Sequence, residues 1–181
     1  QIMNLKTIKE ADVKNKKVLM RVDYNVPLDN GKVTDDTRIK ASLETIEYLL
    51  ENDAKIILMS HLGRPKGAKD EELSLKPVAE KLSKMLKKDV DFADDCIGDL
   101  VKEKIDKMNK GDILMLENTR FHAEEKENDK EFSKKLAEHA DIYVSDAFGT
   151  AHRAHASTEG VSKHLPSYAG FLIEKEIEAL S

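Results

Sequence analysis

Short runs of apolar residues alternate with amphipathic stretches along most of the chain. Four of the runs have the length of buried strands and lead into polar loops; they span 17–22, 55–60, 112–116 and 142–144. Between and after them, apolar residues recur every three or four positions, which is typical of helices that pack one face against a sheet. We predict these helices at about 39–50, 78–86, 97–108, 132–140 and 172–180. Residues 90–92 are a weaker strand candidate, and 156–168 show no clear pattern.

The alternation of strands and helices predicts an α/β fold. We expect a doubly wound, Rossmann-like arrangement of three layers, in which a parallel sheet has helices on both faces and right-handed connections. The carboxyl ends of parallel strands lie at one edge of a sheet, and ligands bind in the crevice there. The loops that follow the four strands are therefore the place to search for functional residues.

Composition narrows the class of protein. The chain has 181 residues, 40% of them hydrophobic, which suits one globular domain or at most two small ones. Its one cysteine, Cys96, indicates a reducing compartment, so we expect a cytoplasmic protein, and we interpret Cys96 as a small buried hydrophobic residue. No apolar stretch could be a signal peptide or span a bilayer, and the net charge of −5 argues against a general nucleic-acid binder. Neither a membrane nor a nucleic acid is an expected partner.

The arginines gather in the strand-end loops, although lysine is the usual cation of this chain. Only five of the 30 cations are arginines: Arg21, Arg38, Arg64, Arg120 and Arg153. Each lies at the end of a predicted strand, just beyond it, or at the start of the helix that follows. The same loops contain four histidines: His61, His122, His152 and His155. Because the guanidinium fork matches carboxylate and phosphate oxygens, this convergence predicts a site for a small, multiply charged anion.

Other chemistry has weaker support in the sequence. Arg38 falls in the first turn of a predicted helix, where a cation opposes the helix dipole. A position that costs local stability indicates a functional role for Arg38; the alternative is a surface ion pair with Asp35 or Asp36. The spacing of His152 and His155 could suit a metal ion, but the adjacent arginine and the lack of further placed ligands argue against it, so we predict no metal site. The sequence contains neither of the glycine-rich phosphate-binding patterns of nucleotide sites.

Six segments, in order along nearly the whole chain, resemble phosphoglycerate kinase: 21–27, 36–39, 60–65, 117–121, 146–157 and 170–177. Any one of them would be a weak signal, but the ordered set is specific. Three residues depart from the usual pattern of the family. Tyr24 stands where phenylalanine is usual, Thr119 where valine is usual, and Ser145 where asparagine is usual.

The resemblance implies an enzyme of glycolysis that transfers a phosphoryl group reversibly between Mg-ATP and 3-phosphoglycerate, forming 1,3-bisphosphoglycerate. The family has two Rossmann-like domains. Residues 1–181 would be the amino-terminal, phosphoglycerate-binding domain, with 172–181 the start of the interdomain helix. The carboxyl-terminal domain, which binds the nucleotide, would be a missing partner, so we expect no cofactor in this domain.

The resemblance also assigns residues by motif position. The implied substrate contacts are Asp23, Tyr24, Asn25, Arg38, His61, Leu62, Gly63, Arg64, Arg120 and Arg153. Asp23 and Asn25 would suit the hydroxyl and carboxylate end. Arg64, Arg120 and Arg153 would suit the phosphate, and Arg38 would be catalytic, facing the transferring phosphoryl group. Arg21, His152 and His155 would complete a basic patch.

Two functional hypotheses follow from the sequence. In the first, the isolated chain binds 3-phosphoglycerate but does not turn it over. In the alternative, it is a non-enzymatic folding or assembly fragment that pairs with itself or with a complementary domain. An unrelated sugar-phosphate-binding domain would explain the arginines but not the ordered motifs.

Overall fold

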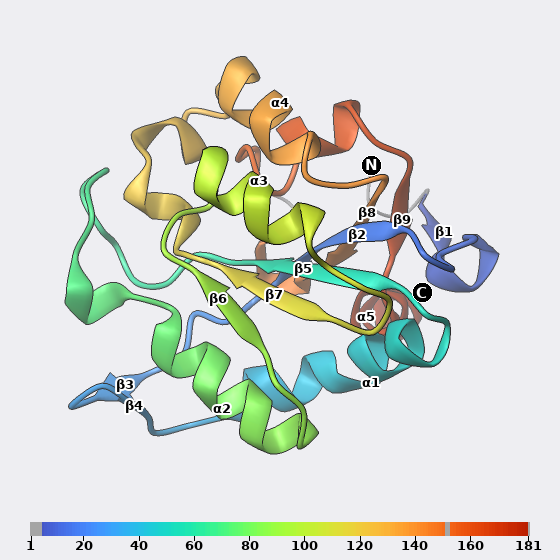
Figure 1. Cartoon of the computed structure of the whole chain (residues 1–181), viewed down its shortest axis with the longest axis horizontal. Coiled ribbons are helices and arrows are strands. Elements are labelled where there is room, and N and C mark those ends of the chain that lie inside the picture. The colour runs from blue at the N-terminus through green and yellow to red at the C-terminus, as the bar shows by residue number, and fades with distance from the viewer. Residues whose placement is uncertain (1–4, 151–152, 181) are drawn as a thin grey trace.

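A seven-stranded parallel sheet forms the centre of the molecule (Figure 1). The computed structural model describes residues 5–150 and 153–180. The strands lie in the order β1-β9-β8-β2-β5-β7-β6. Their bounds are β1 (Lys6–Thr7), β2 (Lys17–Val22), β5 (Lys55–Met59), β6 (Asp91–Ala93), β7 (Ile113–Leu116), β8 (Ile142–Asp146) and β9 (Ser167–Ala169). The predicted α/β fold class is confirmed.

Helices cover both faces of the sheet and complete three layers (Figure 1). On one face lie α1 (Thr37–Glu51), α2 (Lys76–Leu86) and α5 (Phe171–Leu180), and on the other lie α3 (Asp99–Asp106) and α4 (Lys130–Ala137). Strand β2 shows how the core divides, because Val18 and Met20 pack in one apolar cluster while Leu19 packs in the other. Strands buried on both faces are largely apolar, which explains the nearly continuous apolar runs of the sequence; Arg21 of β2 is a buried exception.

The shortest elements lie where the sequence has no apolar run. A turn at residues 30–31 closes a small antiparallel hairpin of β3 (Leu28–Asp29) and β4 (Lys32–Val33). Asn30 and Gly31 both have positive φ, 51° and 73°, as a tight two-residue hairpin turn requires. Strands β1 and β9 pair with each other at one end of the sheet. Two or three residues cannot show a pattern of period two, so neither strand was predicted.

The path of the chain places a crevice beside β2. From β2 the chain moves to β5 on one side, and later it moves from β7 to β8 on the other side of β2. The strand order therefore reverses between β2 and β8, and such a switch point separates the loops beyond the strand ends. Arg21 of β2 lies opposite Met59 of β5 and Ser145 of β8. The loops after these strands, and after β7, surround this point.

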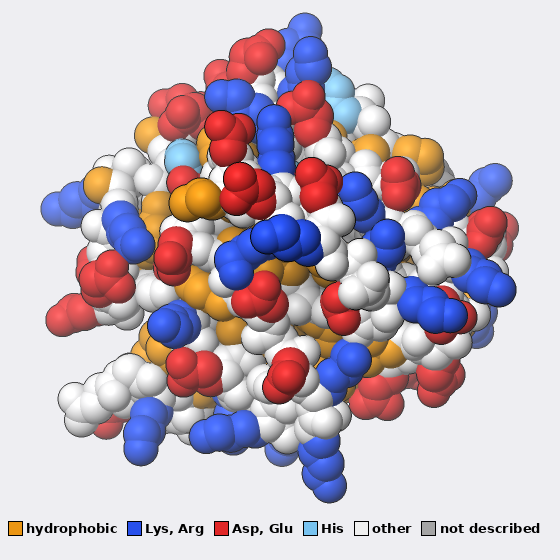
Figure 2. Space-filling model, in the orientation of Figure 1, with side chains coloured by type: hydrophobic (Ala, Val, Ile, Leu, Met, Phe, Trp, Pro, Cys, Tyr) orange, Lys and Arg blue, Asp and Glu red, His pale blue; other side chains and the backbone are white. Residues whose placement is uncertain are grey.

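The surface has charges of both signs. On the face in Figure 2, basic and acidic side chains are interspersed, so that face presents no extended field of one sign. Within residues 5–150 and 153–180, every helix is too short or too polar to be a transmembrane segment.

Candidate anion-binding site

Arg21 lies beneath the candidate site and does not reach its surface. The residue is fully buried, and its guanidinium group donates hydrogen bonds to Ser157 Oγ (2.8 Å), Ser60 Oγ (3.4 Å) and the Val22 carbonyl oxygen. Its Nη2 also lies 2.8 Å from His61 Nδ1. Arg21 thus ties the loops after β5 and β8 to β2. The resemblance places Arg21 in a basic patch; its side chain is enclosed by protein, so any contribution to that patch comes from below.

His61 is held in a defined neutral form by this arginine. A guanidinium group only donates, so Nδ1 must accept and the neutral ring carries its proton on Nε2. The pKa of His61 is lowered to about 2, mainly by burial and then by the charges of Arg21, Arg120, Arg153 and His155. The ring is therefore uncharged at neutral pH, and its Nε2–H can donate to an acceptor.

Glu125 supplies a buried negative charge below the arginines. Its carboxylate accepts hydrogen bonds from Thr119 Oγ1 (2.6 Å), Ser157 N (2.8 Å) and Ser157 Oγ (2.5 Å). Burial lowers the pKa of Arg21, and Glu125 opposes that effect. Glu125 lies in a tract of mixed acidic and basic residues, 124–135, yet it is 0% exposed. One carboxylate in a charged tract carries no pattern that marks it as buried.

Arg120 projects from a short 3-10 turn, Thr119–Phe121, after β7. Asn118 holds this turn, because its Oδ1 accepts from Arg120 N (3.0 Å) and Leu62 N (3.2 Å). Arg120 is only 8% exposed, its Nη1 donates to the Gly63 carbonyl at 3.4 Å, and its Nε is buried without a hydrogen-bond partner in the described structure. Burial lowers the pKa of Arg120, and the neighbouring Arg153 and Arg21 lower it further. An unpaired donor among cations favours an anionic ligand.

The exposed members of the cluster come from the loops after β5 and β8. Arg153 is exposed, and its backbone is fixed by bonds with Thr150 O (3.1 Å) and Thr158 Oγ1 (2.6 Å). His155 is half-buried, with a buried Nδ1 that has no partner among the described residues, and its pKa is lowered first by burial. Arg64 is exposed and close enough to Arg120 to lower its pKa. We call Arg64, Arg120, Arg153, His61 and His155 the cationic cluster.

Arg38 lies in a separate group on the other side of Asp23. Helix α1 begins at Thr37, so the predicted first-turn position is confirmed. Arg38 Nη1 donates to Asp23 Oδ1 (3.2 Å) and to the Asn25 carbonyl (2.8 Å), and its side chain is 53% exposed. The predicted alternative partners were Asp35 and Asp36, whereas the observed ion pair joins Arg38 to the loop after β2.

Three of the predicted contact residues could meet a ligand only through their backbone. Tyr24 is 0% exposed, and its hydroxyl group is hydrogen bonded to Ser42 Oγ at 2.6 Å inside the core. Leu62 is also buried. Gly63 has a φ of 63°, and a Cβ there would lie 2.7 Å from Leu73 Cδ2, so the position requires glycine. Its N–H donates to Asn25 Oδ1 at 2.8 Å, which links the loops after β2 and β5.

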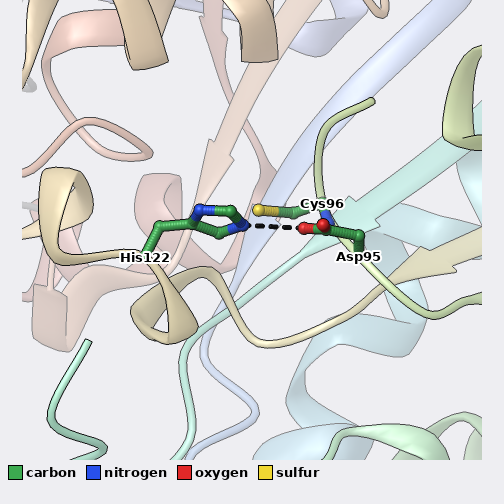
Figure 3. Close-up of side chains that lie close together, drawn as sticks. All are labelled: Asp95, Cys96 and His122. Atoms are coloured by element: carbon green, nitrogen blue, oxygen red, sulfur yellow. Dashed lines mark hydrogen bonds and ion pairs between the residues drawn. The ribbon is translucent and has the colours of Figure 1, made fainter. Parts of the chain in front are cut away.

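Two of the four loop histidines are not in the cationic cluster. His152 lies outside the described residues. His122 Nε2 is 2.7 Å from Asp95 Oδ1, and this hydrogen bond raises the pKa of His122. Its ring lies with Asp95 and Cys96 in a second cluster (Figure 3). Cys96 is fully buried, as expected, and burial raises its pKa well above the usual value.

The geometry as a whole is suited to binding a compact anion with two charged ends. Gly63 connects the two groups of residues, because its carbonyl accepts from Arg120 Nη1 and its N–H donates to Asn25 Oδ1. Glu125 lies within electrostatic reach of Arg21 and Arg120. Fixed donors in a partly dry setting bind anionic oxygens more strongly than donors in water do.

A family model described as phosphoglycerate kinase matches residues 8–181. The chain belongs to the phosphoglycerate kinase family. Two curated relatives named phosphoglycerate kinase are those of Finegoldia magna, 57% identical over 180 residues, and Pelotomaculum thermopropionicum, 54% identical over 178 residues. Each alignment covers 98% of this chain but only 46% and 45% of the relatives. The chain thus spans less than half the length of these curated relatives.

Solved structures of the same family share the fold. Phosphoglycerate kinase from Coxiella burnetii is 42% identical, with a TM-score of 0.88 over 97% of this chain and 44% of that chain. The enzyme from Pyrococcus horikoshii OT3 is 38% identical, with a TM-score of 0.89 over 97% of this chain and 45% of that chain. The family resemblance that the six sequence segments predicted is confirmed.

Proposed function

We propose that this chain is the half of a phosphoglycerate kinase that binds 3-phosphoglycerate, or 1,3-bisphosphoglycerate in the reverse direction. The main support is the cationic cluster at the switch point, above the buried carboxylate of Glu125. A phosphate group requires several donors in a fixed arrangement, and guanidinium groups provide paired donors. Arg120 contributes an unpaired buried Nε, which a phosphate oxygen would satisfy.

The two groups of residues define an orientation for the substrate. In the proposal, Arg64, Arg120 and Arg153 hold the phosphate, and the neutral His61 donates its Nε2–H. Asp23 and Asn25 receive the hydroxyl and carboxylate end. Tyr24, Leu62 and Gly63 shape the crevice with their backbone, and Arg21 positions His61 from below.

Arg38 is the proposed catalytic residue. The acceptor in phosphoryl transfer to 3-phosphoglycerate is a carboxylate, which is already ionised at neutral pH. The reaction therefore needs positioning and charge stabilisation more than it needs a base. Arg38 is half-exposed and bonded only to Asp23 and the Asn25 carbonyl, so it can turn toward negative charge that develops on the transferred group.

The phosphoryl donor in this proposal is Mg-ATP held by a second domain. The curated relatives are about twice as long as this chain, which leaves room for such a domain. We propose residues 1–181 as the phosphoglycerate-binding domain, with 172–181 as the start of the helix that joins the two. Domain closure would bring the donor to Arg38 and exclude water. Alone, the chain would bind substrate without turnover. We propose a cytoplasmic location on the basis of the single cysteine and the glycolytic reaction.

One observation favours the alternative role as an assembly module. Leu180 of α5 is 69% exposed, and the neighbouring Ile177 is only partly covered. An apolar helix end of this kind can pack against a complementary domain or a second copy. Light scattering across a concentration series tests this role. A strict monomer that does not combine with a carboxyl-terminal domain would exclude it.

Calorimetry with 3-phosphoglycerate tests the substrate proposal. We expect binding by the purified chain, at least tenfold weaker binding by Arg120→Ala, and wild-type binding by Lys110→Ala, which removes an exposed cation elsewhere. Glycerate, which lacks the phosphate, should bind weakly or not at all. Binding unchanged in Arg120→Ala, or equal binding of glycerate, would contradict the assignment of the phosphate to the cationic cluster.

A kinase assay tests the claim of inactivity separately. We expect no phosphorylation of 3-phosphoglycerate by this chain with Mg-ATP alone, and activity after addition of a carboxyl-terminal domain from a relative. Turnover by the isolated chain would show that the nucleotide site is already present.

A further inference from the structure

The second cluster, Asp95, Cys96 and His122, lies outside the candidate anion-binding site and has no role in the proposed reaction. Asp95 and Cys96 follow β6, and His122 follows the 3-10 turn after β7. Strands β6 and β7 are paired, with Ala93 opposite Leu116, so the loops beyond their carboxyl ends meet. The sheet register thus brings three side chains with metal-binding atoms together.

The three side chains point toward a common centre (Figure 3). One ligand atom from each lies within 4.8 Å of the other two. Asp95 and His122 are joined by the 2.7 Å hydrogen bond, and their side chains are 51% and 25% exposed. Cys96 is fully buried beneath them. Two ligands are therefore open to solvent and one forms the floor, which gives an ion a path of entry.

The charges around the thiol favour a cation. Asp95, Glu125 and Glu117 each place a carboxylate within electrostatic reach of the Cys96 thiol. This negative charge would attract a bound cation, and the cation would in turn stabilise the thiolate form of Cys96 as a ligand.

We propose that Asp95, Cys96 and His122 bind a divalent transition-metal ion of the zinc class. Thiolate sulfur, imidazole nitrogen and carboxylate oxygen are the zinc ligands of proteins, and three protein ligands leave a fourth position for water. On binding, the Cys96 S–H bond breaks, a sulfur–metal bond forms and the proton passes to solvent. His122 gives up its hydrogen bond to Asp95: the proton on Nε2 passes to solvent, the neutral ring carries its proton on Nδ1, and the Nε2 lone pair binds the ion.

Binding of a metal ion requires only a small rearrangement of the three side chains. Bonds of about 2.0–2.3 Å in a tetrahedral site place ligand atoms about 3.5 Å apart. The pairs of ligand atoms that lie up to 4.8 Å apart must therefore approach by about 1 Å. Asp95 Oδ1 and His122 Nε2, which are 2.7 Å apart, must separate by about as much, and both side chains are partly exposed. The site differs from the pair of His152 and His155 considered from the sequence, because it has three ligand types and a buried thiol.

Cobalt(II) titration of the whole chain tests the proposal, with cobalt as the spectroscopic substitute for zinc. The chain has one cysteine, so a thiolate-to-cobalt charge-transfer band can come only from Cys96. We expect the band to saturate at one ion per chain, to disappear on addition of zinc, and to be absent in Cys96→Ser. His122→Gln and Asp95→Asn should each weaken binding at least tenfold. His164→Gln, at an exposed histidine elsewhere, should have no effect.

The two exposed ligands keep the test decisive if Cys96→Ser fails to fold. His122→Gln and Asp95→Asn retain the buried thiol, and circular dichroism checks that each is folded. Absence of the band in the folded wild-type chain with excess cobalt would overturn the proposal. A band of unchanged affinity in His122→Gln would also overturn it, because the thiol would then bind without the other ligands.

Discussion

Arg21 and Arg153 are the same residue type within one site, yet their surroundings differ completely. Arg21 is 0% exposed, its guanidinium group has four hydrogen-bonding partners, and Glu125 offsets its charge across Ser157. Arg153 is exposed, and only its backbone is fixed. The first contributes to the architecture below the crevice and the second leaves its charge available.

The same difference divides the polar residues around the crevice into two groups, a buried base and an exposed rim. The base consists of Arg21, Ser60, Thr119, Glu125, Ser157 and the buried carboxylate Asp146; the rim consists of Arg38, Arg64 and Arg153. Buried charges are tolerated only when they are paired and hydrogen bonded, so substitutions in the base should reduce stability. Exposed charges contribute little to stability, so substitutions in the rim should mainly change the affinity for a ligand.

The largest effect is expected at Glu125. Glu125→Ala removes the acceptor for Thr119 and Ser157 and leaves the charge of Arg21 without its counter-charge. We expect the free energy of unfolding to fall by about 3–5 kcal/mol, as when one partner of a buried charge network is removed. Urea denaturation measures this. Glu127→Ala, at an exposed carboxylate of the same tract, should change stability by less than about 0.5 kcal/mol. Equal losses of stability in Glu125→Ala and Glu127→Ala would mean that the base is not a charge network.

The next effect depends on pH and concerns Asp146. Burial raises its pKa from 3.8 to about 7, although hydrogen bonds from Thr45 and from the backbone of Leu172 and Ile173 oppose the shift. A raised folded pKa stabilises the fold fully below pH 4, and that contribution is lost as the pH rises to about 7. Asp146→Asn cannot ionise, so its stability relative to wild type should increase from pH 4 to 7 by a few kcal/mol, at about 1.4 kcal/mol per pKa unit.

Thermal and urea unfolding at several pH values check this difference. Asp89→Asn, at an exposed carboxylate, should follow the wild-type curve within about 0.5 kcal/mol. If the free energy of unfolding of Asp146→Asn changes with pH in the same way as that of wild type, Asp146 is ionised in the folded chain at neutral pH. The base would then hold a second full negative charge.

The rim could be predicted from the sequence much better than the base. Strand-end arginines are visible because the apolar run of a buried strand marks where its loop begins, and Arg64 and Arg153 both follow such runs. The six segments that resemble phosphoglycerate kinase then indicated the family. Glu125 and Ser157 could not be selected, because burial of a polar residue depends on neighbours that are distant in the sequence. Tyr24 shows the same limit, since a motif position does not reveal that its side chain points into the core.

The third effect concerns affinity at the rim. Arg153→Ala should weaken binding of 3-phosphoglycerate by at least tenfold, because a charged hydrogen bond contributes about 1.5–3 kcal/mol. The free energy of unfolding should change by less than about 0.5 kcal/mol, since the side chain is exposed. Calorimetry measures the affinity and urea denaturation measures the free energy of unfolding, so using both on the same protein separates the two effects. A large loss of stability with unchanged affinity would place Arg153 in the base.

The smallest of the four effects is expected at Arg38, which forms an ion pair with Asp23 but belongs to the rim. The pair with Asp23 is half-exposed on the arginine side, so Arg38→Ala should cost at most about 1 kcal/mol in urea denaturation. Asp23 keeps a hydrogen bond from Asn25 N at 3.1 Å, so its carboxylate is not left without a donor. A loss above about 2 kcal/mol would contradict the division, because it would make this exposed pair as structural as Arg21. A small loss would agree with the proposed role of Arg38, in which it faces the transferred phosphoryl group.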